Sequence, residues 1–288
     1  MELMPLSILL GSVNIVGNLL LIIAVWKTKL DRDSNRYIFL CDLSLGAMIV
    51  GLADICREAI LRSHLVTNTD NFCRVLVTFI IAGVVQACYG LLAYVFDQFL
   101  FIAHPLHYHA MMTRRNCIGI VIMTKVISLL HILVTTVEWN FDIPCSYFLN
   151  VPKWHHITAF VLCFGFPLLV IVALQGYTIS VAWRHLQRIR QSQVVPFDQP
   201  DQQKRTNSIR KVITTTLILI CLGLSWLPMA FMFLWAAVSD IGERFFGVLD
   251  VIGLTYYSYG FWIPLVYAIR SPALRTAVKR KLCNAGAG

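Results

Sequence analysis

Residues 75–96 read VLVTFIIAGVVQACYGLLAYVF and contain no Asp, Glu, Lys or Arg over 22 positions. At a rise of 1.5 Å per residue, a helix of this length extends about 33 Å, enough to cross the ~30 Å hydrocarbon core of a bilayer. The run is continuous, whereas the strands of a membrane β-barrel read as alternating segments of about 10 residues. The stretch therefore predicts a membrane-spanning helix.

Comparable apolar runs lie on both sides of this stretch. Together they predict seven spans, at roughly 4–27, 36–62, 73–103, 115–138, 154–190, 208–238 and 246–270. Of the 288 residues, 58% are hydrophobic and 14% are charged, and the mean hydropathy is +0.70. A soluble domain has about 25% charged residues, so a soluble enzyme is excluded. We predict an all-α membrane protein, a seven-transmembrane helix bundle that forms a single domain over residues 1–288.

The basic residues separate by side of the membrane. Of the 24 Lys and Arg, 18 fall in alternate loops and after the last span, five fall on the opposite side, and Lys125 lies within a span. Because cytoplasmic loops carry the excess of Lys and Arg, this pattern predicts an outside N-terminus and a cytoplasmic C-terminus. We expect a multi-pass plasma-membrane protein. The net charge of +9 is then a topology signal, which disfavours nucleic acid as a partner.

Two polar segments flank the last spans. Residues 191–208 are rich in Gln, Pro and Asp and predict a mobile cytoplasmic loop. Residues 272–282 carry Leu and Val at a helical spacing with basic residues between them, which predicts a short amphipathic C-terminal helix on anionic membrane lipid. Cys283 at its end is a candidate for palmitoylation, with a free thiol as the equal alternative.

Short motifs occur in order along the spans. They are Gly17-Asn18, Leu43-Ser44-Leu45, Cys73, Asp97-Gln98-Phe99 followed by His104-Pro105-Leu106, Pro167, Ser225-Trp226-Leu227-Pro228 and Pro264-Leu265-Val266-Tyr267. In this order and spacing, the whole chain resembles the rhodopsin-like (class A) G-protein-coupled receptors. The resemblance implies a receptor without a cofactor, not an enzyme, that binds a ligand outside and a heterotrimeric G protein inside. It also implies a disulfide between Cys73 and Cys145, both on the predicted outer side.

The resemblance assigns activation or G-protein-facing roles to the inner ends and proline kinks of the spans. These positions are Asp97, Gln98, Phe99, Pro167, Trp226, Pro228, Pro264 and Tyr267. The family usually carries Asp-Arg-Tyr where this chain has Asp97-Gln98-Phe99, so the arginine that contacts the G protein is missing. An alternative is therefore a receptor-fold binding or scaffold protein that does not couple to a G protein.

Further positions within the spans depart from the family. Ala47 and Ile263 replace ligands of the family's sodium site, so we expect no metal site there. Gln175 replaces the tyrosine that the family carries in span five.

Two departures introduce charge into the membrane. Asp42 stands where the family carries Asn, and Lys125 stands where it carries Trp. An unpaired charge at this depth costs at least ~2.5–3.5 kcal/mol. Because the two family positions touch, we predict a buried Asp42–Lys125 ion pair. The alternative is that Lys125 extends to the membrane surface while Asp42 faces the cytoplasm.

The resemblance also implies a ligand cavity between the outer halves of the spans. Its expected lining is Ile80, Ile81, Val84, Ala159, Cys163, Trp226, Met229, Ala230, Phe233, Gly253 and Tyr257. This lining is mostly apolar, so a small apolar ligand, lipid-like or odorant-like, fits best. Asp54, Arg57 and Glu58 form a polar exception. They are interpreted either as a site for a polar head group or a peptide's basic residue, or as a solvated charge cluster.

Other functions have weaker support. The segments 105–108 (PLHY) and 264–270 resemble parts of odorant receptors. A transporter or channel is a remote alternative, because the spans hold too few ionisable residues for an ion path. Catalysis is disfavoured because His131 is isolated, His155 and His156 are expected at the lipid interface, and no nucleophile stands beside a base.

Overall fold

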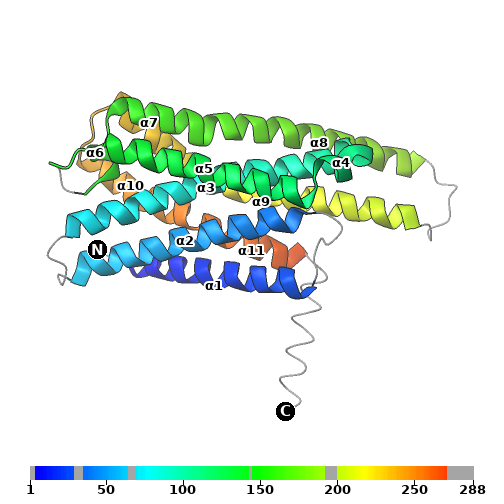
Figure 1. Cartoon of the computed structure of the whole chain (residues 1–288), viewed down its shortest axis with the longest axis horizontal. Helices are drawn as coiled ribbons and strands as arrows, with labels where there is room; N and C mark the ends of the chain where they lie inside the picture. The colour runs from blue at the N-terminus through cyan, green and yellow to red at the C-terminus, as the bar shows by residue number, and fades with distance from the viewer. Residues whose placement is uncertain (1–3, 29–34, 64–68, 143–144, 192–199, 271–288) are drawn as a thin grey trace, which may run out of the picture.

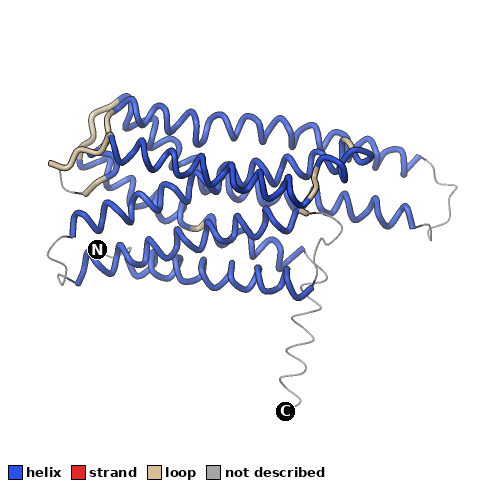
Figure 2. The backbone as a smooth tube through the Cα atoms, in the orientation of Figure 1, coloured by secondary structure: helices blue, strands red, loops and turns tan. Residues whose placement is uncertain are grey.

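A computed structural model of the chain describes residues 4–28, 35–63, 69–142, 145–191 and 200–270. In this part of the chain every regular element is a helix, and the long helices run side by side along one axis (Figures 1 and 2). In chain order they are α1 (Met4–Thr28), α2 (Arg36–Ser63), α3 (Thr69–Ala103), α4 (Pro105–Met111), α5 (Arg114–Val137), α6 (Tyr147–Asn150), α7 (Lys153–Ala159), the π-helical turn η1 (Phe160–Gly165), α8 (Phe166–Gln191), α9 (Pro200–Val238), α10 (Glu243–Tyr257) and α11 (Tyr259–Arg270).

Six helical stretches in this part of the chain are long and apolar enough to cross a membrane. The seventh predicted span differs from the expectation of one helix over 246–270, because α10 ends at Tyr257 and α11 begins at Tyr259. The Ser258 hydroxyl donates to the carbonyl oxygen of Thr255 at 2.6 Å. A side chain that bonds back to the backbone competes with regular helix geometry, which accounts for the interruption.

The fifth and sixth spans depart from the prediction in their detail. The fifth is the continuous series α7, η1 and α8, in which the π turn ends two residues before Pro167. Proline has no amide hydrogen and crowds the preceding turn, and a π turn absorbs this mismatch. The sixth, α9, begins at Pro200, so the loop expected over 191–208 is wrong from residue 200 onward. Proline suits the first turn of a helix, and the Gln, Lys and Arg that follow are good helix formers. The expected helix at 272–282 and Cys283 lie outside the described residues.

Helix α3 occupies the centre of the bundle, packed against α2, α5 and α8 (Figure 1). Close approach between α1 and α11 depends on Gly260, where an added Cβ would overlap the Asn14 side chain. The Asn18 amide donates to the Gly260 carbonyl at 2.8 Å across this contact. The outer surface is itself apolar, with Leu133, Leu224 and similar side chains mostly exposed. Such a surface suits lipid rather than water.

Candidate functional site

The Cys73–Cys145 disulfide covers a cavity of about 530 Å³. We call this end of the bundle the disulfide end, and the opposite end the Asp97 end. Most residues that the sequence suggested as ligand contacts line this cavity. They are Ile80, Ile81, Val84, Ala159, Cys163, Met229, Phe233, Gly253 and Tyr257, with Arg57 and Glu58. Trp226 and Ala230 do not line it and instead face a second cavity, between α3, α8 and α9.

Charged side chains concentrate on one wall of the disulfide-end cavity. Arg57 Nη2 lies 3.1 Å from Asp54 Oδ1 and 2.7 Å from Glu58 Oε1. Asp54 is fully buried behind Arg57, and Asp250 adds another carboxylate to the lining from α10. Among the described residues of this wall, three carboxyl side chains, those of Asp54, Glu58 and Asp250, therefore accompany a single guanidinium, that of Arg57.

Two aromatic residues of α6, Tyr147 and Phe148, form the roof of the cavity. The sequence analysis did not predict either of them as a lining residue. Both are buried, and both rings pack against Phe233 of α9 at centroid distances of 5.7 and 5.2 Å. Burial raises the pKa of the Tyr147 phenol, so it stays neutral and can hydrogen-bond. The position of Cys145 could have indicated these two residues, because a disulfide at Cys145 holds the residues that follow it over the ends of the helices.

The histidines of α7 help to hold this roof. The Nε2 atom of His155 lies 3.1 Å from the Tyr147 hydroxyl, and Nε2 of His156 lies 3.2 Å from the Phe148 carbonyl oxygen. Both imidazoles are buried, so the expectation that they lie at the lipid interface is wrong. His131 is not isolated either, because its ring lies 5.4 Å from that of His155. These side chains face inward because α7 packs against the loop that the disulfide ties down.

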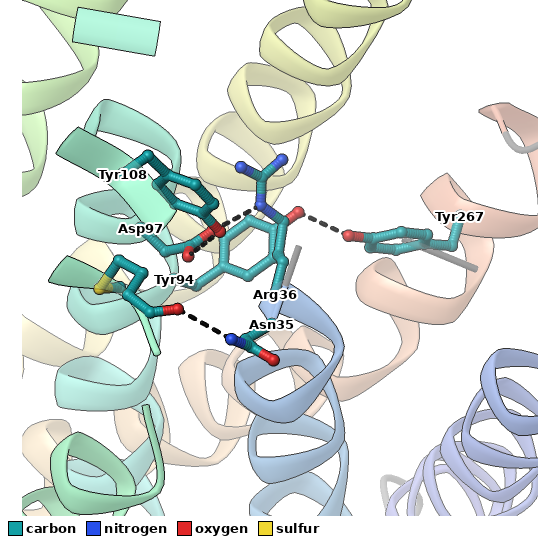
Figure 3. Close-up of polar contacts among 7 residues, drawn as sticks. Asn35, Arg36, Tyr94, Asp97, Tyr108 and Tyr267 are labelled. Atoms are coloured by element: carbon teal, nitrogen blue, oxygen red, sulfur yellow. Dashed lines mark hydrogen bonds and ion pairs between the residues drawn. The ribbon is translucent and has the colours of Figure 1, made fainter. Parts of the chain in front are cut away.

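The Asp97 end is organised by a buried ion pair between α2 and α3. Arg36 Nε lies 2.8 Å from Asp97 Oδ2, and the Tyr108 hydroxyl donates to Asp97 Oδ1 at 2.8 Å (Figure 3). The Arg36 and Asp97 side chains are 2% and 0% exposed. The Arg36 guanidinium also lies over the rings of Tyr94 and Phe101, at 5.9 and 5.5 Å from the centroids. A cation at this distance gains attraction from the ring faces.

Neighbouring contacts fix the geometry of this pair. The Asn35 amide donates to the Met112 carbonyl oxygen at 2.8 Å, which ties the start of α2 to the end of α4 (Figure 3). Tyr94 of α3 and Tyr267 of α11 share a hydrogen bond between their hydroxyls (Figure 3). Burial, together with the neighbouring Asp97 carboxylate, raises the pKa of Tyr108, so its phenol stays protonated and can donate.

Gln98 and Phe99, the other two residues of the motif, lie beside this pair. Gln98 is fully buried, and neither its amide nitrogen nor its amide oxygen has a hydrogen-bond partner among the described residues. The Phe99 ring packs against Tyr177 of α8 at 5.5 Å and against His104 at 5.9 Å. The polar side chain that replaces the family's arginine is therefore buried without compensation.

Arg36 is a functional candidate that the sequence analysis did not identify. It was considered only as one of the basic residues that indicate the membrane topology. The signal that could have identified Arg36 was electrostatic. Asp97 at the end of a span, without an adjacent arginine, needs another cation on the same side of the membrane. Arg36 begins the preceding span on that side.

Two further charged residues, Asp42 of α2 and Lys125 of α5, lie together in the membrane-spanning part of the bundle. Lys125 Nζ is 2.6 Å from Asp42 Oδ1. Gln86 Nε2 of α3 donates to the same oxygen at 3.2 Å. Asp42 is buried, whereas the Lys125 side chain is about one-third exposed at the lipid-facing side of α5. The contribution of this pair to folding stays a prediction.

Comparisons with known proteins agree with this architecture. Residues 17–267 match the family described as 7 transmembrane receptor (rhodopsin family). Melanocortin receptor 5 of Homo sapiens is 25% identical over 291 residues, covering 96% of this chain and 83% of that receptor. Melanocortin receptor 4 of Danio rerio is 24% identical, covering 95% of this chain and 82% of that receptor. Since the family match spans nearly the whole bundle, this chain is a multi-pass membrane receptor, not an enzyme, and belongs to the rhodopsin family of seven-transmembrane receptors.

Proposed function

We propose that this receptor detects a small amphiphile with an apolar body and a cationic head group, and that it signals to a heterotrimeric G protein. The observation that carries the proposal is the two-sided lining of the disulfide-end cavity. Its apolar side includes Ile80, Ile81 and Val84, and its charged side has Glu58 and Asp250 around Arg57. Ligand sites of this kind use apolar surface for affinity and a few polar groups for orientation.

The charge balance of the wall favours a cation over an anion. Arg57 already contacts Asp54 and Glu58, so its charge is shared between two carboxylates. An incoming ammonium or guanidinium would meet the remaining negative charge near Asp250. An incoming carboxylate would have to displace Asp54 or Glu58 from Arg57, which costs free energy because Asp54 is fully buried.

The proposal is tested by thermal stabilisation of the purified receptor, a readout that does not assume coupling. Dodecylammonium should raise the unfolding temperature, whereas dodecanoate of the same chain length should not. Glu58→Gln should weaken the effect, and Glu243→Gln, an exposed carboxylate at the same end, is the matched control. Equal stabilisation by both amphiphiles would rule out the cationic head group.

A second candidate ligand is a melanocortin, because melanocortin receptors are among the relatives whose match covers nearly the whole chain. A basic residue of a bound peptide could meet the same acidic wall. Against a bulky ligand, Tyr147 and Phe148 roof the cavity next to the disulfide, and its volume is about 530 Å³. Saturable binding of a labelled melanocortin, lost in Glu58→Gln, would favour this candidate.

Topology and coupling complete the proposal. The disulfide end faces outward and the Asp97 end faces the cytoplasm, which fits the excess of Lys and Arg at the latter. Cys283 remains a candidate for palmitoylation.

At the Asp97 end, the Arg36–Asp97 pair holds the resting conformation in place of the family's arginine. A comparison of basal signalling between the native chain and Gln98→Arg distinguishes a receptor that couples to a G protein from a scaffold that does not. A scaffold should signal only with the added arginine.

A further inference from the structure

A second cavity lies within the membrane-spanning part of the bundle, between α3, α8 and α9, and has a volume of about 360 Å³. Cys163 and Phe164 separate it from the disulfide-end cavity, since they line both. Nearly all of its lining is apolar. The polar exceptions include Gln175 of α8 and Thr216 of α9, which are hydrogen-bonded to each other at its wall.

Among the described residues, two polar atoms of the cavity-lining side chains have no hydrogen-bond partner, and they are Gln175 Oε1 and Trp226 Nε1. Gln175 Nε2 donates to Thr216 Oγ1 at 2.8 Å, and the Thr216 hydroxyl donates to the Val212 carbonyl oxygen at 2.9 Å. Since the Thr216 hydroxyl already donates its proton to the Val212 carbonyl oxygen, it can only accept a hydrogen bond from Gln175. The amide nitrogen of Gln175 must therefore be the group that faces Thr216. The Gln175 side chain is only 5% exposed, and its Oε1 atom has no partner in the described part of the chain. A buried carbonyl oxygen without a donor is costly, so a turn of the Gln175 side chain toward the cavity would let Oε1 accept one O–H or N–H.

The shape of the cavity indicates entry from the bilayer. Its rim includes Val172 and Leu227, which are 62% and 53% exposed on the lipid-facing surface, whereas its inner wall reaches the buried Trp226. Gly176 and Gly223 widen it, because a Cβ added at either position would meet nothing within 4 Å. At about 30 Å³ for each small heavy-atom group, the space holds roughly a dozen such groups.

We propose that this cavity binds a membrane-dissolved alcohol, with its hydroxyl donating to Gln175 Oε1 and its hydrocarbon body against the apolar walls. The open acceptor selects a neutral donor, since a carboxylate offers no proton and an ammonium would bury a charge without a counterion. The molecule would bridge α8 and α9 beside Trp226. The site is separate from the ligand cavity proposed above and does not depend on it.

The test uses the full chain in phosphatidylcholine nanodiscs, with 1-dodecanol as the probe and dodecyl methyl ether as the matched control without a donor. We expect 1-dodecanol to raise the unfolding temperature saturably and the ether to bind about tenfold more weakly, the loss of one hydrogen bond. Equal shifts by the two probes would overturn the proposal, and this comparison needs no variant.

Two variants locate the site. Gln175→Met removes the acceptor but leaves the Thr216 hydroxyl bonded to Val212, and should weaken 1-dodecanol to the level of the ether. Gly223→Leu fills the cavity and should abolish the saturable shift. Gly119→Leu is the matched control, because Gly119 lies on the exposed face of α5 with the same open space around it. A shift that survives in Gly223→Leu, or is lost in Gly119→Leu, would contradict this location.

Discussion

Replacing Arg36 by glutamine should destabilise the resting receptor and raise its basal signalling. The change leaves the Asp97 carboxylate, which is 0% exposed, without its guanidinium partner, while the Tyr108 hydrogen bond remains. Removing one partner of a buried ion pair costs about 3–5 kcal/mol. At about 1.4 kcal/mol per tenfold, this corresponds to a change of roughly 10²- to 10⁴-fold in an equilibrium constant.

The same free energy acts on activation if the pair forms only in the resting conformation. Because α2 and α3 are joined by the pair, any state that separates their ends at Asp97 loses it. Two assays on Arg36→Gln therefore test both effects. The unfolding temperature of the purified receptor should fall, and ligand-independent nucleotide exchange on a G protein should rise. Arg115→Gln removes an exposed arginine at the same end of the bundle and should change stability by less than about 0.5 kcal/mol.

A double-mutant cycle with Asp97→Asn separates the pair from other effects of the arginine. The stability costs of Arg36→Gln and Asp97→Asn should be non-additive, with a coupling energy of about 1–3 kcal/mol. If the costs simply add, or if Arg36→Gln proves as mild as Arg115→Gln, the ion pair does not hold the resting state.

Three further changes test other buried polar groups. Asp42→Asn and Lys125→Trp should reduce surface expression singly but less than additively together, because each alone leaves a charge of the 2.6 Å pair uncompensated. Gln98→Leu should raise the unfolding temperature, since it removes two buried polar atoms that have no partner among the described residues, worth about 1–3 kcal/mol. Tyr108→Phe should cost about 1.5–3 kcal/mol for a hydrogen bond to a carboxylate, measured by thermal unfolding. Because the pKa of Tyr108 is raised in the fold, this contribution should persist up to the usual tyrosine pKa of about 10 and be lost only as the pH rises further.

The membrane spans could be predicted because bilayer thickness constrains only length and hydropathy. The interruptions could not, because they depend on particular hydrogen bonds. Nothing in the apolar run over 246–270 distinguishes the serine at 258, whose hydroxyl bonds back to the Thr255 carbonyl, from a serine within a regular helix. Likewise, Pro167 predicted a kink, but the π turn that accommodates it depends on how α7 packs.

The ligand cavity was predictable where helices provide its wall and unpredictable where a loop provides its roof. Ile80 and Val84 are one turn apart on α3, so helical periodicity places both on the same face. Tyr147 and Phe148 belong to a four-residue helix whose position depends on the disulfide and on α7. Sequence periodicity carries no information about such a segment, because its direction is set by contacts distant in the chain.

The missing arginine of the Asp-Arg-Tyr motif has a different meaning once Arg36 is considered. In the sequence it suggests that coupling is lost. In the structure the charge is still paired with Asp97, but from α2, 61 residues away. An arginine next to Asp97 could change partners by turning its own side chain within one helix. Arg36 can release Asp97 only if the ends of α2 and α3 shift relative to each other. The buried amide of Gln98, the next residue on α3, has no hydrogen-bond partner among the described residues, so a conformation that opens this end could satisfy it. The cost of breaking the pair and the gain at Gln98 then act in opposite directions, and their balance sets the basal activity of the receptor.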